Sequence, residues 1–265
     1  MRLWPERAAF EEAHREGRNG LVWTKLVADM DTPVSLMLKL AGGRRDSFLL
    51  ESVTGGEVRG RYSVIGLEPD LIWRCRGERA EINRHPGEEP EAFEPETRPS
   101  LESLRALIAA SRADIPRDLP PMAAGLFGYL GYDMIRLVER LPEPNPDPLG
   151  LPDAMLLRPG LVAIVDNIRA EVTLVAPAWQ DAGRAPAEAW ERAAARLEDA
   201  VARMDRAEPE ATPVTPADDR AARSLAPVSN TSHARYVEMV ERAKEYIRAG
   251  DIFQVVPSQR WALPL

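Results

Sequence analysis

The chain has 265 residues, of which 45% are hydrophobic and 29% are charged, a composition typical of a globular protein with one large domain or two smaller ones. Its formal net charge of −8 argues against a nucleic-acid partner, because binding to a phosphate backbone normally requires a basic surface. The single cysteine, Cys75, excludes a disulfide within the chain and indicates the cytoplasm, and neither a signal peptide nor a membrane-spanning stretch is recognisable.

A strand and a helix are the first elements that the sequence predicts after a polar lead-in over residues 1–18. Residues 21–28 alternate as a strand, and Pro33 stands at the favoured first position of a helix. We expect this helix to cover a sheet and to end at Gly42-Gly43. Four apolar residues follow at helical spacing: Val34, Met37, Leu38 and Ala41.

The chain is organised around residues 49–66, with the sequence LLESVTGGEVRGRYSVIG. Two apolar runs flank a pair of glycines, which tolerate the positive φ of a tight reversal, and this pattern predicts a β-hairpin. Alternation along the strand places Ser52 on the face of Leu50 and Glu51 on the other face. A small hydroxyl on an apolar face beside a carboxylate suits a site for a small zwitterion. In the alternative interpretation, Ser52 only ends the strand and Glu51 is solvated.

The ordered series LLESV, GGE and RGRYSVIG resembles the N-terminal signature of anthranilate synthase component I. The segments ADMDTPVSLMLKLA and GYLGYD resemble the same family. In that family the serine of LLES lines the pocket for tryptophan, the feedback inhibitor. The resemblance therefore implies that Leu50, Glu51 and Ser52 bind tryptophan, and the role falls most firmly on Ser52.

Further elements follow in an antiparallel pattern without regular βαβ alternation. Strands are predicted over residues 70–76, 79–84, 154–157, 161–166 and 171–176, and helices over residues 100–110 and 186–205. Residues 85–100 are predicted as an exposed loop, with Ser100 capping the helix that follows. In residues 123–139 the glycine spacing does not match a nucleotide-binding loop, and it predicts closely packed backbone in a strand that precedes a short helix.

Near the C-terminal end, residues 207–229 are predicted as a linker, and a helix begins at Ser232 and ends at Gly250. The stretch IRAGDIFQVVPSQRW resembles the opening of the chorismate-binding domain of the same family, and it includes a predicted strand over residues 252–256. Gln254 matches a position where water-adding relatives carry a general-base lysine and amine-adding relatives carry glutamine. Because an amide cannot deprotonate water, glutamine is consistent with ammonia as the nucleophile. Alternatively, Gln254 only forms hydrogen bonds within the strand layer.

The resemblance implies an α+β fold of two packed antiparallel β-sheets with outer helices, truncated because only the N-terminal part of a longer protein is covered. The expected domains are a regulatory scaffold over residues 1–206, the linker over 207–229, and the start of the chorismate-binding domain over 230–265. No metal ligands are expected in this segment. The family's Mg²⁺, which prefers oxygen ligands, would be held by residues downstream of Leu265.

The implied reaction is that of anthranilate synthase, a lyase that converts chorismate and ammonia to anthranilate and pyruvate in the first step of tryptophan biosynthesis. The implied partner is a glutamine amidotransferase subunit that supplies the ammonia, and tryptophan is the implied inhibitor. This segment alone should be inactive. Two alternatives remain: aminodeoxychorismate synthase component I of the folate pathway, and a non-catalytic regulatory protein that binds an amino acid.

Overall fold

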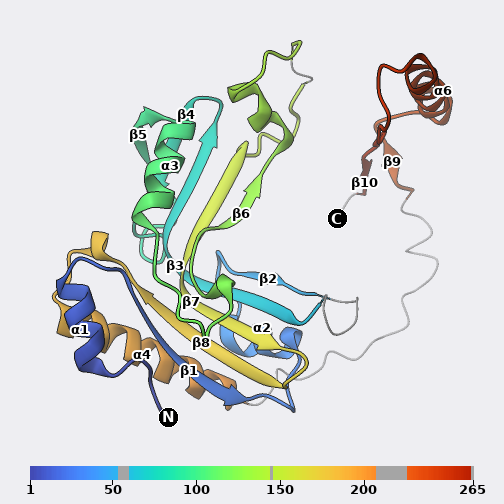
Figure 1. Ribbon diagram of the computed structural model, residues 1–265. Helices are drawn as coiled ribbons and strands as arrows, with labels where there is room; N and C mark the ends of the chain where they lie inside the picture. Colours follow the sequence, from blue (N-terminus) through green and yellow to red (C-terminus); the bar gives the residue numbers. More distant parts are fainter. Residues whose placement is uncertain (53–59, 144–145, 207–225, 264–265) are drawn as a thin grey trace. The chain divides into compact units, whose positions relative to one another are not determined.

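The computed structural model describes residues 1–265 except 53–59, 144–145, 207–225 and 264–265, and it divides into two units, residues 1–209 and 210–265 (Figure 1). The helices of the first unit are α1 (Arg7–Arg15), α2 (Pro33–Ala41), α3 (Ser100–Ala110) and α4 (Pro186–Met204), with short 3-10 turns η1 (Pro121–Ala123), η2 (Tyr132–Leu137) and η3 (Gln180–Ala182). Its strands are β1 (Gly20–Val27), β2 (Phe48–Leu50), β3 (Tyr62–Arg76), β4 (Arg79–Asn83), β5 (Glu94–Pro99), β6 (Phe127–Leu130), β7 (Ala154–Asp166) and β8 (Glu171–Ala178).

The strands of the first unit form one antiparallel sheet of eight strands, in the order β1-β8-β7-β3-β4-β5, with β2 added to β3 and β6 added to β7. Helices pack on the outside of this sheet, which confirms the predicted α+β class (Figure 1). The long central strands β3 and β7 extend through both halves of the sheet, so the part that carries β4, β5 and β6 is continuous with the part that carries β1, β2 and β8.

The predicted breaks within β3 and β7 are wrong. Both strands continue through their proline-containing segments, and the register shifts between Pro69 and Leu71. Pro69 lies opposite Pro159, so two residues that lack an N–H donor face each other where the ladder is interrupted. Glu68, with a φ of 52°, turns the chain at the same place. The prolines therefore bend the sheet instead of ending its strands.

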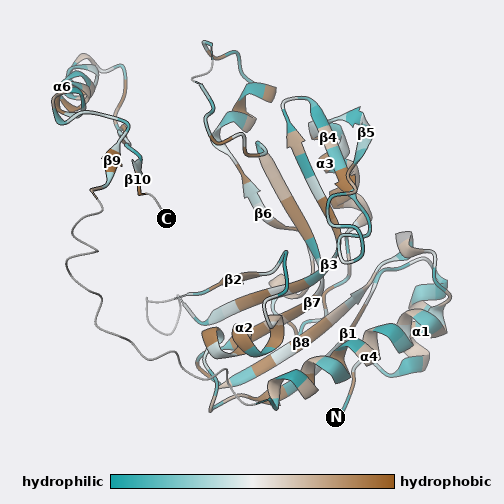
Figure 2. Cartoon of the chain, turned by 180° about the vertical axis from the view of Figure 1, so that it is seen from behind, coloured by the Kyte–Doolittle hydropathy of each residue, from teal (hydrophilic) through white to brown (hydrophobic). Residues whose placement is uncertain are grey.

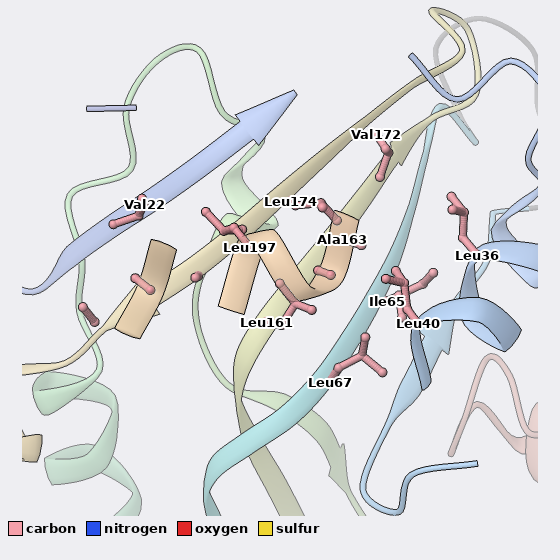
Figure 3. Close-up of a cluster of buried hydrophobic side chains, with 14 of the residues drawn as sticks. Val22, Leu36, Leu40, Ile65, Leu67, Leu161, Ala163, Val172, Leu174 and Leu197 are labelled. Atoms are coloured by element: carbon pink, nitrogen blue, oxygen red, sulfur yellow. The ribbon is translucent and has the colours of Figure 1, made fainter. Parts of the chain in front are cut away.

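The main core lies between one face of the sheet and helices α1, α2 and α4 (Figure 3). Alternate residues of the strands point toward these helices, and Leu197 of α4 is fully buried among them. The labelled members from the strands are Val22, Ile65, Leu67, Leu161, Ala163, Val172 and Leu174. Hydrophobic residues follow β3, β7 and β8, whereas α4 is mixed in character (Figure 2). The other face of the sheet is covered by residues 113–127, around Leu119 and Ala123.

Helix α2 has the predicted bounds, but it packs through a different face. Its buried residues include Leu36 and Leu40, which join the main core, whereas Val34 and Leu38 are 48% and 54% exposed. Apolar residues surround most of this short helix, so their spacing alone fits two faces. The ends of the helix are as the sequence predicts, because Thr32 forms a capping box at the start and Gly42 has a left-handed conformation at the end.

The segment predicted as a loop over residues 85–100 contains a strand instead. Strand β5 pairs with β4 at the edge of the sheet, where its prolines do not interrupt a central ladder. Ser100 does not cap helix α3, because its hydroxyl donates to the carbonyl of Gly77 at 2.6 Å and the residue before it, Pro99, has no capping side chain. Ser100 therefore ties the start of α3 to the β3–β4 turn.

Residues 127–137 confirm the predicted strand and short helix, which are β6 and η2. A side chain at Gly128 would place its Cβ 2.0 Å from the carbonyl oxygen of Met155. Gly128 also has a φ of 156°, which L residues rarely adopt. The glycine thus permits the close approach of β6 to β7.

The second unit contains β9 (Val228–Ser229), α6 (His233–Ala249) and β10 (Trp261–Ala262), and β9 pairs with β10. Ser232 caps α6 by accepting from the amide of Arg235, and Gly250 ends the helix with a φ of 80°, as predicted. The predicted strand over residues 252–256 is not formed. The ladder of this unit lies at Trp261–Ala262 instead. Of the predicted linker, residues 207–225 lie outside the described part, and Val228–Ser229 form β9.

Candidate functional site

The candidate effector site lies where β2 ends. The hairpin pairing is confirmed, since Phe48 pairs with Gly66 and Leu50 pairs with Val64, while its glycine turn lies outside the described residues. Leu50 is 56% exposed and is the last residue of β2. Ser52 therefore lies beyond the strand on which alternation placed it; it is half-buried, and Glu51 is exposed.

A side chain holds the main chain at Ser52. The amide of Ser52 donates to the hydroxyl oxygen of Ser63 at 3.4 Å, and Ser63 is fully buried on β3. The side-chain amide of Asn167, in the β7–β8 turn, donates to the same oxygen at 3.3 Å and to the carbonyl of Gly60 at 3.4 Å. The two sides of one hairpin and the β7–β8 turn, which is 104 positions from Ser63, thus meet at one hydroxyl.

The adjacent Asp166 and Arg61 form an ion pair that joins the end of β7 to the start of β3. The Arg61 Nε lies 3.1 and 3.0 Å from the two carboxylate oxygens, and Nη2 lies 2.5 Å from one of them. Burial opposes ionisation of Asp166, but hydrogen bonds from Arg61 and from the amides of Arg169 and Ile168 outweigh it. The pKa of Asp166 is therefore lowered from its ordinary value of 3.8.

This lowered pKa predicts a defined pH dependence of stability. The pair contributes its full stabilisation above the unfolded-state pKa of about 4, and the contribution is lost as the pH falls through the lower folded-state pKa. The difference in unfolding free energy between the wild type and Asp166→Asn should therefore be constant from about pH 5 to about pH 7 and should shrink below about pH 4. Urea unfolding at a series of pH values measures it, and a pH-independent difference would contradict the assignment.

The residues at and near the end of β2 offer a half-buried hydroxyl and an exposed apolar surface. Arg61 is 33% exposed and its guanidinium lies 4.8 Å from the ring centroid of Tyr62, while Leu50 presents an exposed apolar surface. A hydroxyl beside an apolar surface can take part in recognising a small ligand with an apolar body, whereas the guanidinium of Arg61 is engaged by Asp166. The sequence and the resemblance made Ser52 a candidate, whereas Ser63 and Asn167 carried no local signal, because their contact depends on the pairing of β3 with β7.

Gln254 lies in the second unit, in residues without regular secondary structure, and its side chain is exposed. Within the described residues no group of three or more His, Cys, Asp or Glu side chains could hold a metal ion, so the donors present there do not fit Mg²⁺. Across the same described residues, no helix combines the length and the apolar character needed to cross a membrane.

The first unit also has clefts that are lined by other residues. One of about 520 Å³ lies beside α3 and contains the buried guanidinium of Arg158, whose nitrogens lie 2.9 Å from each carboxylate oxygen of Asp70. The same guanidinium lies 4.9 Å from the ring centroid of Trp179. Because both groups of this pair are engaged with each other, we assign the pair a structural role.

Residues 47–265 match the family described as chorismate binding enzyme, so the chain belongs to that family. It is 57% identical over 258 residues to anthranilate synthase component 1 of Cereibacter sphaeroides, covering 96% of this chain and 50% of that protein. The Thermus thermophilus protein of the same name is 40% identical, with coverages of 90% and 46%. The resemblance stated from the sequence is therefore confirmed, and the chain spans about half the length of the curated relatives it matches.

A solved structure supports the fold. The crystal structure of anthranilate synthase component I from Streptococcus pneumoniae TIGR4 matches with a TM-score of 0.58 and 22% sequence identity, covering 89% of this chain and 48% of that chain. At this identity the likeness concerns the fold alone.

Proposed function

We propose that the chain is part of the large subunit of an anthranilate synthase, which converts chorismate and ammonia to anthranilate, pyruvate and water in the cytoplasm. The observation that carries this proposal is the 57% identity to a protein named anthranilate synthase component 1, which extends over 96% of the chain. The match to the chorismate binding enzyme family, over residues 47–265, includes both the LLES segment and the FQVVPSQRW segment that were singled out in the sequence. The proposed partner is a glutamine amidotransferase subunit, which would supply ammonia.

The proposed regulation is inhibition by tryptophan at the end of β2. Ser52 supplies a half-buried hydroxyl, Leu50 supplies an apolar surface and Glu51 supplies a carboxylate for the ammonium group of the ligand. In this proposal Gln254 contacts the reacting groups without transferring a proton, because an amide has no useful pKa for that step. Magnesium would be held by residues of the full-length protein beyond these 265.

The product formed by the full-length protein tests this proposal. With its amidotransferase, chorismate, glutamine and Mg²⁺, it should form anthranilate, which is detected by fluorescence and by chromatography. The product 4-amino-4-deoxychorismate without anthranilate would identify the folate-pathway alternative. Tryptophan binding without any chorismate consumption would identify a regulatory protein. The isolated 265-residue chain should not consume chorismate with ammonium and Mg²⁺, and turnover there would contradict our placement of the catalytic groups.

A further inference from the structure

We propose that Asn167 and Ser63 are positioning residues of the tryptophan site, and that the β7–β8 turn sets the affinity for the inhibitor by fixing the main chain at Ser52. The proposal rests on the function proposed above. It assigns to the turn after β7 a role in regulation, through one buried hydroxyl.

The need for such a support follows from where β2 ends. The last ladder pair is Leu50 with Val64, so the main chain at Ser52 lies beyond the regular pairing of β2 with β3. The amide of Ser52 instead donates to the side chain of Ser63. A serine hydroxyl that binds a ligand needs a fixed backbone, because a displacement of about 1 Å is enough to break a hydrogen bond of ordinary geometry.

The hydroxyl of Ser63 is itself fixed by its donors. An oxygen of this kind offers two acceptor sites and one donor, and two N–H groups approach it, from Ser52 at 3.4 Å and from Asn167 at 3.3 Å. Ser63 is fully buried, so solvent does not replace either contact readily. The hydrogen bond from Asn167 therefore determines how the oxygen is presented to the amide of Ser52.

Asn167 is in turn held firmly against the start of β3. Its backbone amide donates to the carbonyl of Arg61 at 2.9 Å, and its side chain also donates to the carbonyl of Gly60. The neighbouring Asp166–Arg61 ion pair joins the same two segments. The turn is thus attached by main-chain, side-chain and ionic contacts to the segment that carries Ser63.

The test uses the full-length protein with its amidotransferase and measures the inhibition constant for tryptophan. Asn167→Ala and Ser63→Ala should each raise this constant about 3- to 10-fold, the effect of losing one hydrogen bond that supports the site. Because Asn167 acts through Ser63, the double variant should be no weaker in tryptophan binding than Ser63→Ala alone. If the double variant instead raised the inhibition constant by the product of the two single effects, Asn167 would not act through Ser63.

Asn19→Ala provides the matched control. The side chain of Asn19 also joins distant segments, since it donates to the carbonyls of Ala110 and Arg112 and accepts from the amide of Gln180. This variant should lower the melting temperature and leave the inhibition constant unchanged. If the inhibition constant of every variant, including Asn19→Ala, rose in step with its loss of stability, the proposal would be overturned.

The outcomes also separate this inference from the proposed function. If Ser52→Phe relieves inhibition while Asn167→Ala and Ser63→Ala bind tryptophan as the wild type does, the positioning role is wrong and the site stands. If Ser52→Phe is inhibited normally, the site itself is misplaced. Absence of anthranilate formation by the wild type would instead contradict the proposed reaction.

Discussion

Replacing Ser52 by phenylalanine is expected to raise the tryptophan concentration for half-maximal inhibition of the full-length enzyme about 100-fold. The ring would occupy space beside Leu50 at the end of β2, and the variant lacks the hydroxyl. Crowding of a packed site costs about 1–3 kcal/mol and loss of a hydrogen bond costs about 1 kcal/mol, and every 1.4 kcal/mol is a factor of ten. Inhibition curves at fixed chorismate measure the effect.

Ser47→Phe is the matched control for this variant. Ser47 is also half-buried, but it precedes β2, and its hydroxyl donates to the carbonyl of Arg44. Its replacement should leave tryptophan inhibition unchanged, and anthranilate formation without tryptophan should remain measurable in both variants. Normal inhibition of Ser52→Phe would remove Ser52 from the effector site.

The largest effect on stability is expected at Arg203 of α4. Its side chain is 1% exposed; it donates to the carbonyl of Leu40, and its Nη2 lies 2.7 Å from Glu68 Oε1. The Nε lies 3.0 Å from Asp199 Oδ2 without the geometry of a hydrogen bond, so the contact with Glu68 is the better ion pair. Arg203 thereby connects α4, the end of α2 and the bend of β3.

Arg203→Met should lower the free energy of unfolding by about 3 kcal/mol, since removing one partner of a buried pair leaves the other uncompensated. We place the loss at the lower end of the usual range because Glu68 is 25% exposed and keeps Arg196, whose Nε is 3.3 Å from Glu68 Oε2. Urea unfolding measures the change. Arg192→Met, on the exposed part of the same helix, should change it by less than about 0.5 kcal/mol. Equal effects of the two substitutions would contradict this role for Arg203.

Local sequence signals predicted the ends of α2 and α6 well, whereas the predicted cap of α3 at Ser100 was wrong. Thr32 and Gly42 bound α2, and Ser232 and Gly250 bound α6, because capping and left-handed conformations depend on a few neighbouring residues. The packed face of α2 was not predictable in the same way, since apolar residues surround the helix and the sheet selects Leu36. Likewise, Pro159 by itself predicts a strand break. In the structure it lies opposite Pro69, and β7 continues through it.

The candidate site shows the same difference between what local sequence signals predict and what depends on the fold. Ser52 was singled out by the family resemblance, because its position in the hairpin alone also fitted a residue that only ends the strand, and it lies beyond the end of β2. The support from Ser63 and Asn167 could not be predicted, because these residues are separated by 104 positions and meet only through the register of β3 with β7. The ion pair of Arg61 with Asp166 depends on that register too.

The location of bound tryptophan tests the central claim most directly. A crystal structure of the full-length protein with tryptophan should show the ligand against the hydroxyl of Ser52 and the side chain of Leu50, with the contact between Ser52 and Ser63 intact. Tryptophan bound at a place that does not include the end of β2 would contradict the assignment of this region as the effector site.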